Sequence, residues 1–104
     1  MHGDRNDETD VFLSTLSDAR RRWVVRYVGA NHPTDLKTIA DDLAAYEDTD
    51  RRGVYSNLYQ HHILILDASD IVDYNDRSKE ITRGPKHSRA LEILEFVDAQ
   101  VARS

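Results

Sequence analysis

Apolar residues recur at helical spacing through the first two thirds of the chain. Two such stripes predict amphipathic helices, one with its N-cap at Ser17 and the next with its N-cap at Thr34. A short apolar segment over residues 11–16 predicts a helix before them. A further helix is expected from about Arg51. Its inward face is predicted to consist of Val54, Leu58, His61 and Ile65.

The apolar pattern then changes to a period of two, which is typical of strands. Residues 71–74 and 79–82 are predicted to form two strands, joined by a tight turn over residues 75–78. Gly84 and Pro85 end the second strand, and a last helix is expected from Lys86. The chain is therefore predicted to be α+β and mainly helical. Three helices followed by a two-stranded wing form the arrangement of a winged helix-turn-helix.

The last helix is apolar over most of its circumference, with nine apolar residues among the thirteen positions 90–102. Such a helix packs on more than one side. We expect it to form a homodimer together with the first helix; the alternative is that it packs only on its own domain. The expected interface residues are Val11, Phe12, Leu16, Ala90, Leu91, Leu94, Val97 and Val101.

These patterns divide the 104 residues into one domain with two flanking segments. Residues 1–9 are expected to be a disordered acidic N-terminus. Residues 10–85 are expected to form the winged helix-turn-helix domain, and residues 86–104 the dimerisation helix.

Composition narrows the class of protein. The net charge is −5, fourteen of the nineteen acidic residues are Asp, and eleven of the fourteen basic residues are Arg. We interpret this choice of charged residues as that of a protein from a high-salt cytoplasm; an ordinary acidic protein is the alternative. No apolar run is long enough to span a membrane, so no membrane partner is expected. Cysteine is absent, which excludes disulfides and thiol-based redox sensing.

Basic residues nevertheless gather in two places. Residues 11–34 contain four arginines against one aspartate, and residues 77–89 contain five basic residues against one glutamate. The predicted helix from Arg51 has a polar and aromatic outward face without a carboxylate. Arginine, amide and hydroxyl side chains suit base edges and phosphates, so we expect this helix and the wing to bind double-stranded DNA. The candidate DNA-binding residues are Arg20, Arg21, Arg22, Arg51, Arg52, Tyr55, Ser56, Asn57, Tyr59, Gln60, Arg77 and Lys79.

Two alternatives stay open for these residues. Arginine and tyrosine are also favoured at protein interfaces, so the same face could serve a winged-helix protein–protein interaction module that binds no DNA. The basic segment of residues 77–89 could instead balance acidic helices of the same chain.

Four segments also resemble the small winged-helix transcription regulators of haloarchaea: residues 16–22, 36–40, 51–62 and 71–74. The similarity covers roughly residues 14–83. It implies a DNA-binding transcription regulator. Because we expect two copies to bind DNA through equivalent helices, the operator is expected to be pseudo-palindromic. The chain further resembles an oxidant-responsive member of that family, which implies a role in oxidative stress. In two places it departs from the family pattern.

The first departure is residues 62–66, which lack the family's proline, so we expect the third helix to continue there. The second is Asp70, which replaces a glycine before the first wing strand; aspartate tolerates the left-handed backbone conformation.

Other chemistry finds little support. His61 and His62 are adjacent, so their side chains point about 100° apart on a helix and are expected to be structural rather than metal ligands. The acidic residues over 41–50 are expected to be a solvated face, although inorganic cations could bind between protein and DNA. No serine lies in a nucleophile motif and no glycine-rich phosphate loop is present. We therefore expect no enzyme, no cofactor and no metal site.

Overall fold

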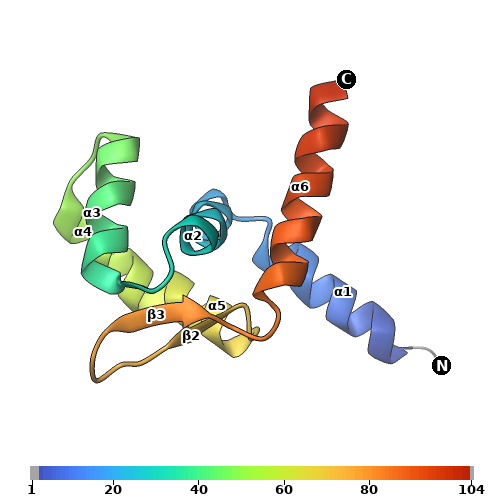
Figure 1. Cartoon of the computed structure of the whole chain (residues 1–104), viewed down its shortest axis with the longest axis horizontal. Helices are drawn as coiled ribbons and strands as arrows, with labels where there is room; N and C mark the ends of the chain where they lie inside the picture. The colour runs from blue at the N-terminus through green and yellow to red at the C-terminus, as the bar shows by residue number, and fades with distance from the viewer. Residues whose placement is uncertain (1–2, 104) are drawn as a thin grey trace.

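A computed structural model describes the backbone of residues 3–103 and the side chains of residues 8–101. The chain is α+β and mainly helical, with a small antiparallel sheet, which confirms the fold class at that level (Figure 1). The elements are α1 (Gly3–Thr15), α2 (Ala19–Ala30), β1 (Thr34–Asp35), α3 (Leu36–Glu47), α4 (Arg51–Asn57), a π-helical turn η1 (Leu58–His62), α5 (Ile63–Ala68), β2 (Val72–Tyr74), β3 (Glu80–Arg83) and α6 (His87–Arg103).

The N-caps of α2 and α3 each lie one residue later than predicted. Asp18, not Ser17, caps α2: its Oδ1 accepts from the backbone N–H groups of Arg20 and Arg21 at 2.8 and 3.1 Å. The Ser17 hydroxyl instead donates backwards to the Ser14 carbonyl at 2.7 Å. Asp35, not Thr34, caps α3 through a 2.8 Å bond from the Thr38 amide. In both places a carboxylate, rather than the neighbouring hydroxyl, accepts hydrogen bonds from the free backbone N–H groups at the start of the helix.

Strand β1 was not predicted. Its two residues form the edge of a sheet with the order β1-β3-β2, in which Thr34 lies opposite Ile81 and Asp35 opposite Glu80. Strand β3 also pairs with β2, where Tyr74 lies opposite Ile81. Two residues are too few to show a period-two pattern, so only the partner strand, far along the sequence, reveals β1.

Helices α4 and α5 are continuous through η1, as expected from the missing proline, and together these elements form one long helix over residues 51–68. The inward face changes along the way: His61 is exposed, whereas His62 is only 5% exposed. The prediction of His61 inside was therefore wrong. A π-helical turn holds one more residue than an α-helical turn, so it moves the inward face on by one position. Val54, Leu58, His62 and Leu66 form the buried row, and Ile65 is only partly buried.

The connection from α5 into the sheet depends on a close backbone approach. Asp70 has a φ of 62°, which confirms the expected left-handed conformation. Gly84 lies against it: a Cβ at Gly84 would come within 2.4 Å of the Asp70 carbonyl oxygen. The Lys86 amide donates to that same oxygen at 2.8 Å, so this corner sets where α6 begins.

Helix α1 begins at Gly3, so the described part of the segment expected to be disordered is helical. Phe12 in this helix and Leu16 just after its end are buried in the core, which anchors the helix. The core is built mainly from α2, α3, the long helix and the sheet, and its fully buried side chains are Val24, Val25, Val28, Leu36, Ile39, Ala40, Leu58, Ile63, Leu66, Ile71, Val72, Ile81 and Ala90.

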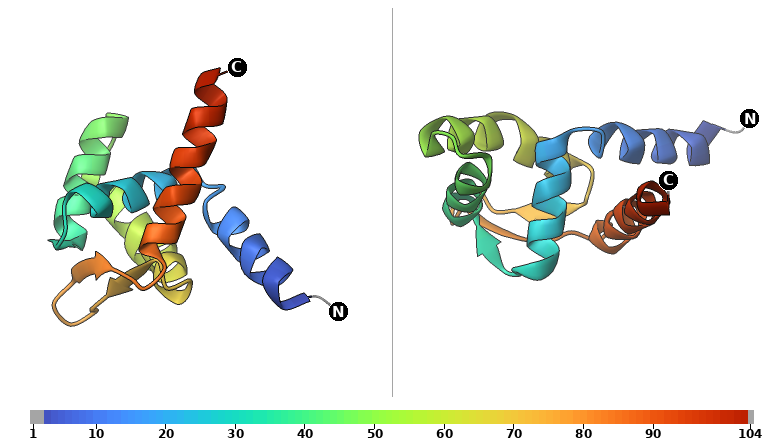
Figure 2. Two further views of the ribbon diagram at one scale, coloured as in Figure 1. Left: turned by 45° about the vertical axis from the view of Figure 1, so that its right-hand side comes forward. Right: turned by 90° about the horizontal axis from the view of Figure 1, so that it is seen from above.

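Helices α1 and α6 project from one side of the domain (Figure 2). Helices α3 and α4 and the tip of the β2–β3 hairpin lie on the opposite side. The two predicted surfaces, one for DNA and one for a second copy, therefore face in different directions.

Candidate nucleic-acid interface

Helix α4 presents a polar face that is held in place by its own cap and core contacts. The Asp50 carboxylate caps the helix by accepting from the Gly53 amide at 3.0 Å. Val54 is buried beneath, so Arg52 and Ser56 point outward and are exposed. No carboxylate occurs from residue 51 to residue 66. Within the described part of the chain no ion pair holds Arg52, so its charge is available to a partner.

Aromatic side chains connect this face to the hairpin. The rings of Tyr55 and Tyr59 stack with centroids 6.3 Å apart. The Lys79 ammonium lies 5.0 Å from the centroid of the Tyr59 ring, a cation–π distance. The long helix and the hairpin are thereby joined, and the structure brings together the predicted residues of both elements.

The hairpin turn is organised by Asn75, whose Oδ1 accepts from the amides of Arg77 and Ser78 at 2.9 and 3.1 Å. This places Arg77 at the tip with an exposed side chain. Lys79 has a φ of 67°, and its ammonium pairs with Asp76 at 3.0 Å. That ammonium lowers the pKa of the Asp76 carboxyl, so Asp76 is ionised and offsets part of the basic charge here.

A hollow of about 380 Å³ lies between α3, α4 and the hairpin. Lys37, Arg51 and Lys79 contribute its positive charges. Lys37 and Arg51 each pair with Asp41 at 3.2 Å, and Lys79 pairs with Asp76. The hollow is lined by Asp35, Lys37, Arg51, Tyr55, Ser78 and Lys79. The hollow therefore contains both positive and negative side chains, whereas the sequence predicted a surface with basic residues only.

The three consecutive arginines of α2 do not form a free basic patch, contrary to the prediction. Arg20 makes two bonds to Glu47 of α3, at 2.6 and 3.0 Å, and donates to the Asn57 Oδ1 at 2.7 Å. Arg20 and Asn57 thus tie α2, α3 and α4 together. Arg22 is half-buried and donates to the Leu16 carbonyl at 3.0 Å.

Arg21 is the clearest correction, because it is only 9% exposed and lies inside the domain. It donates to the Thr15 carbonyl at 2.6 Å and lies 3.1 Å from the Nδ1 atom of His62. Burial lowers the pKa of His62, and the charges of His61 and Arg21 add to this against the opposing effect of Asp18. His62 is therefore neutral at pH 7 and accepts from Arg21 at the π-helical turn.

The predicted dimer residues separate into two groups. Phe12, Leu16, Ala90 and Leu94 are at most 6% exposed and pack in the protomer's own core, so the prediction of an interface role for them was wrong. At Ala90 and Leu94 the helical spacing marks the contact of α6 with the rest of its own domain. The exposed members are Val11, Val97 and Val101; Leu91 is partly buried.

Sequence reasoning missed two further exposed apolar residues beside these, Leu13 on α1 and Phe96 on α6. Helix α6 is held to α2 by an Arg26–Asp98 ion pair at 2.9 Å. Exposed apolar side chains thus lie on both projecting helices: Val11 and Leu13 on α1, and Phe96, Val97 and Val101 on α6.

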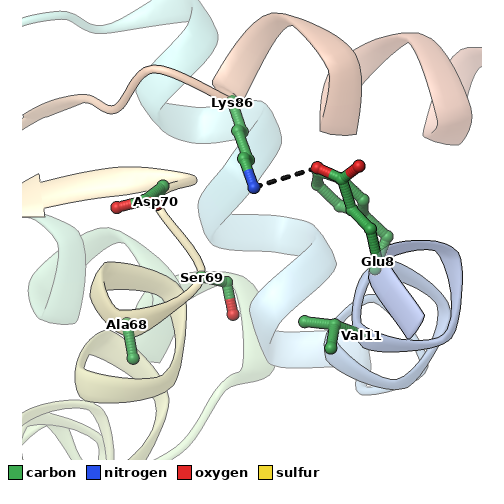
Figure 3. A pocket seen from close by; sticks show the side chains of 7 residues that line it. Glu8, Val11, Ala68, Ser69, Asp70 and Lys86 are labelled. Carbon is green, nitrogen blue, oxygen red and sulfur yellow. Dashed lines mark ion pairs between the residues drawn. The ribbon is translucent and has the colours of Figure 1, made fainter. Parts of the chain in front are cut away.

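A second hollow, of about 260 Å³, lies where α1, the end of α5 and the start of α6 meet (Figure 3). The Lys86 ammonium and the Glu8 carboxylate pair across it at 2.9 Å, which lowers the pKa of Glu8. Val11 and Phe12 form its apolar wall. This ion pair joins α1 to the base of α6, so it positions the two projecting helices.

Within residues 8–101, no three His, Asp or Glu side chains are arranged to hold a metal ion. Among the helices described, none is long and apolar enough to cross a membrane.

Comparison with known proteins assigns the chain to a family without assigning it a function. The chain matches the family described as "Domain of unknown function (DUF7344)" over residues 13–82. Neither the curated proteins nor the solved structures gave a match. The match covers α2, α3, the long helix, strands β1 and β2, and β3 up to Thr82, which include the elements of the candidate interface. The chain therefore belongs to the DUF7344 family.

Proposed function

We propose that the protein is a winged-helix DNA-binding transcription regulator that acts as a homodimer. The observation that carries this proposal is the outward face of α4: it combines an exposed arginine, which has no ion pair among the described residues, with neutral hydrogen-bonding side chains, has no carboxylate of its own, and adjoins the hairpin that bears Arg77 and Lys79. The net negative charge of the chain opposes indiscriminate binding to nucleic acid, so a localised face without carboxylates favours specific binding.

The arrangement supports a helix-turn-helix reading. Helix α3 and the long helix beginning with α4 follow one another with a three-residue connection, and the β2–β3 hairpin lies beside the second of them (Figure 1). In such domains the second helix enters the major groove and the wing contacts the backbone or the minor groove. Here α4 is the recognition helix and the β2–β3 hairpin is the wing.

The contacts follow from the chemistry of the exposed residues. Arg52 suits a guanine edge or a phosphate, and Ser56 and Gln60 suit base edges. The hydroxyls of Tyr55 and Tyr59 suit phosphates, as does Arg77 at the wing tip. Arg20 and Asn57 hold the helices that present this face rather than the DNA.

The homodimer is proposed to form through the exposed apolar surface of α6 and α1. Phe96 and Val101 are 66% and 68% exposed, and both stand on a helix that projects away from the recognition face. Two recognition helices related by a twofold axis would enter successive major grooves about 34 Å apart, which implies a pseudo-palindromic site.

A high-salt cytoplasm would make this binding unusual. Phosphate contacts normally weaken steeply with salt, because binding releases condensed counterions. On the proposed DNA face, Arg52 and Arg77 are the exposed basic residues that have no ion pair with a described carboxylate, so we expect few phosphate contacts and a shallow salt dependence. Fluorescence anisotropy with one operator over a salt series measures it, and a steep decline would contradict this part of the proposal.

A role in oxidative stress rests only on the resemblance to an oxidant-responsive regulator. The sequence has no cysteine and one methionine, so the protein is proposed to respond through another component rather than through its own thiols. Release of DNA when peroxide alone is added to the purified complex would contradict that indirect role.

The proposal is tested by selecting bound fragments from random or genomic DNA and footprinting them. Arg52→Ala should weaken specific binding by about 1–3 kcal/mol if Arg52 makes a bidentate base contact. Arg89→Ala is the matched control: it removes an exposed arginine from the start of α6, outside the residues proposed for either interface, so it should change affinity little. Absence of sequence-dependent retention at any salt concentration would overturn the proposal and favour a protein–protein module.

A further inference from the structure

Three aromatic side chains gather between α2 and the second half of α3. The rings of Trp23 and Tyr27 stack with centroids 4.9 Å apart, and the centroid of the Tyr46 ring lies 6.1 Å from that of Trp23. Trp23 and Tyr27 are partly buried, whereas Tyr46 is 75% exposed. The end of α3 that carries Tyr46 points away from the β2–β3 hairpin (Figure 1). These three residues therefore form an aromatic surface that is separate from the wing.

The surroundings of the aromatic surface are negatively charged. The Tyr27 hydroxyl donates to Asp42; burial and this carboxylate raise the pKa of Tyr27 to about 12, so the phenol keeps its proton. Asp48 caps the C-terminus of α3, where the helix dipole already places partial negative charge. The last turn of α3 contains no basic residue. Neither Asp42 nor Asp48 has an ion pair among the described residues, so this negative charge is not neutralised within the protomer.

No cation from the described part of the chain covers the aromatic surface. The neighbouring arginines of α2 have other partners: Arg22 donates to the Leu16 carbonyl at 3.0 Å, and Arg26 pairs with Asp98 at 2.9 Å. The cation–π contact found among the described residues lies at the wing, on Tyr59. An exposed aromatic ring beside uncompensated carboxylates is thus open to a cation from another molecule.

We propose that the aromatic surface docks a partner protein that presents an exposed arginine side chain. A guanidinium group is planar and weakly hydrated, so it can stack on the Tyr46 ring while the charge of Asp42 and Asp48 attracts it. Lysine fits less well, because its compact ammonium is strongly hydrated and has no plane to stack. Nucleic acid is disfavoured, because its phosphates would meet the same carboxylates. This docking surface goes beyond the proposed function and does not require it.

The test uses Trp23, the only tryptophan of the chain, as an intrinsic fluorescent probe. Titration of the full chain with a tetra-arginine peptide should change this fluorescence in a saturable way. The neutral isostere tetra-citrulline and potassium chloride of equal ionic strength should not reproduce the change, and tetralysine should bind more weakly. Equal binding of the arginine and lysine peptides, or an arginine response that does not saturate, would overturn the proposal.

A second copy of the chain as the occupant would reveal itself without any peptide. The fluorescence of Trp23 would then depend on protein concentration, and Tyr46→Leu would abolish that dependence. This result would overturn the proposal of a different partner protein. No DNA is present in these titrations, so their failure is distinguishable from a failure of the proposed function.

Variants test the ring and the charge separately. Tyr46→Leu should weaken binding of the arginine peptide roughly two- to fivefold, as for an exposed cation–π contact. Asp48→Asn should weaken it to a similar extent, because asparagine also tolerates the φ of 55° at this position and the substitution removes only the charge. Phe96→Leu and Asp73→Asn are the matched controls, since they remove an exposed ring from α6 and an exposed carboxylate from β2. Equal losses in the controls, or unchanged affinity in Tyr46→Leu or Asp48→Asn, would overturn the proposal.

Discussion

Phe96 offers the sharpest test of the homodimer. It is 66% exposed on α6, beside Val97 and Val101, which are also exposed. A phenylalanine presents ~200 Å² of surface, so about 130 Å² of Phe96 is open to water in the isolated protomer. Covering that area fully would contribute about 3 kcal/mol per protomer at ~25 cal/mol per Å².

A twofold interface contains the residue twice, and a partner that covers half of its exposed surface would thus gain about 3 kcal/mol per dimer. Phe96→Ala should therefore raise the dimer Kd roughly a hundredfold, at ~1.4 kcal/mol for each factor of ten. Sedimentation equilibrium over a concentration series measures this Kd directly. Thermal unfolding at high dilution should change little, because the protomer leaves this side chain mostly uncovered.

The matched control is Tyr46→Ala, which removes a 75% exposed aromatic side chain from α3, away from α6. It should leave the Kd unchanged. A wild-type chain that stays monomeric at micromolar concentration, or a Phe96→Ala Kd equal to the wild-type value, would refute the reasoning. Leu94→Glu would not serve, because Leu94 is buried in the protomer's own core and its substitution would unfold the domain.

Two further predictions concern stability. Gly84→Ala should destabilise the fold by roughly 1–3 kcal/mol, because its Cβ would meet the Asp70 carbonyl. Gly53→Ala should instead stabilise α4 by about 0.5–1 kcal/mol, because the nearest neighbour of its Cβ would lie at 3.7 Å. Urea unfolding of both variants measures the two changes in stability, and equal effects would contradict the prediction. The pKa of His62 is lower in the fold than in the unfolded chain, so the stability it contributes is present above about pH 6.5 and is lost as the pH falls through its folded pKa. Urea unfolding over a pH series measures this loss, and a His62→Gln chain that keeps the same pH dependence would show that another group causes it.

The local pattern predicted the helices and the hairpin well, since each rests on neighbours within a few residues. The predictions that failed depended on distant partners. From the sequence, Arg20 and Arg21 are predicted to be surface charges. In the structure they contact Glu47 and His62, which lie far along the chain. The candidate DNA face on α4 needed no such partner, so the sequence could identify its exposed residues.

The sequence by itself determined the order of the helices and the hairpin, the carboxylate-free face of α4 and the absence of thiol chemistry, because composition and periodicity are local properties. Tertiary structure alone decided which histidine lies inside, which arginines stay free and which apolar side chains remain uncovered. Periodicity shows that a helix has an apolar side, but two partners, its own domain or another molecule, would produce the same pattern. In α6 only part of the apolar surface packs against the protomer: Leu94 is buried in the core, whereas Phe96 is exposed.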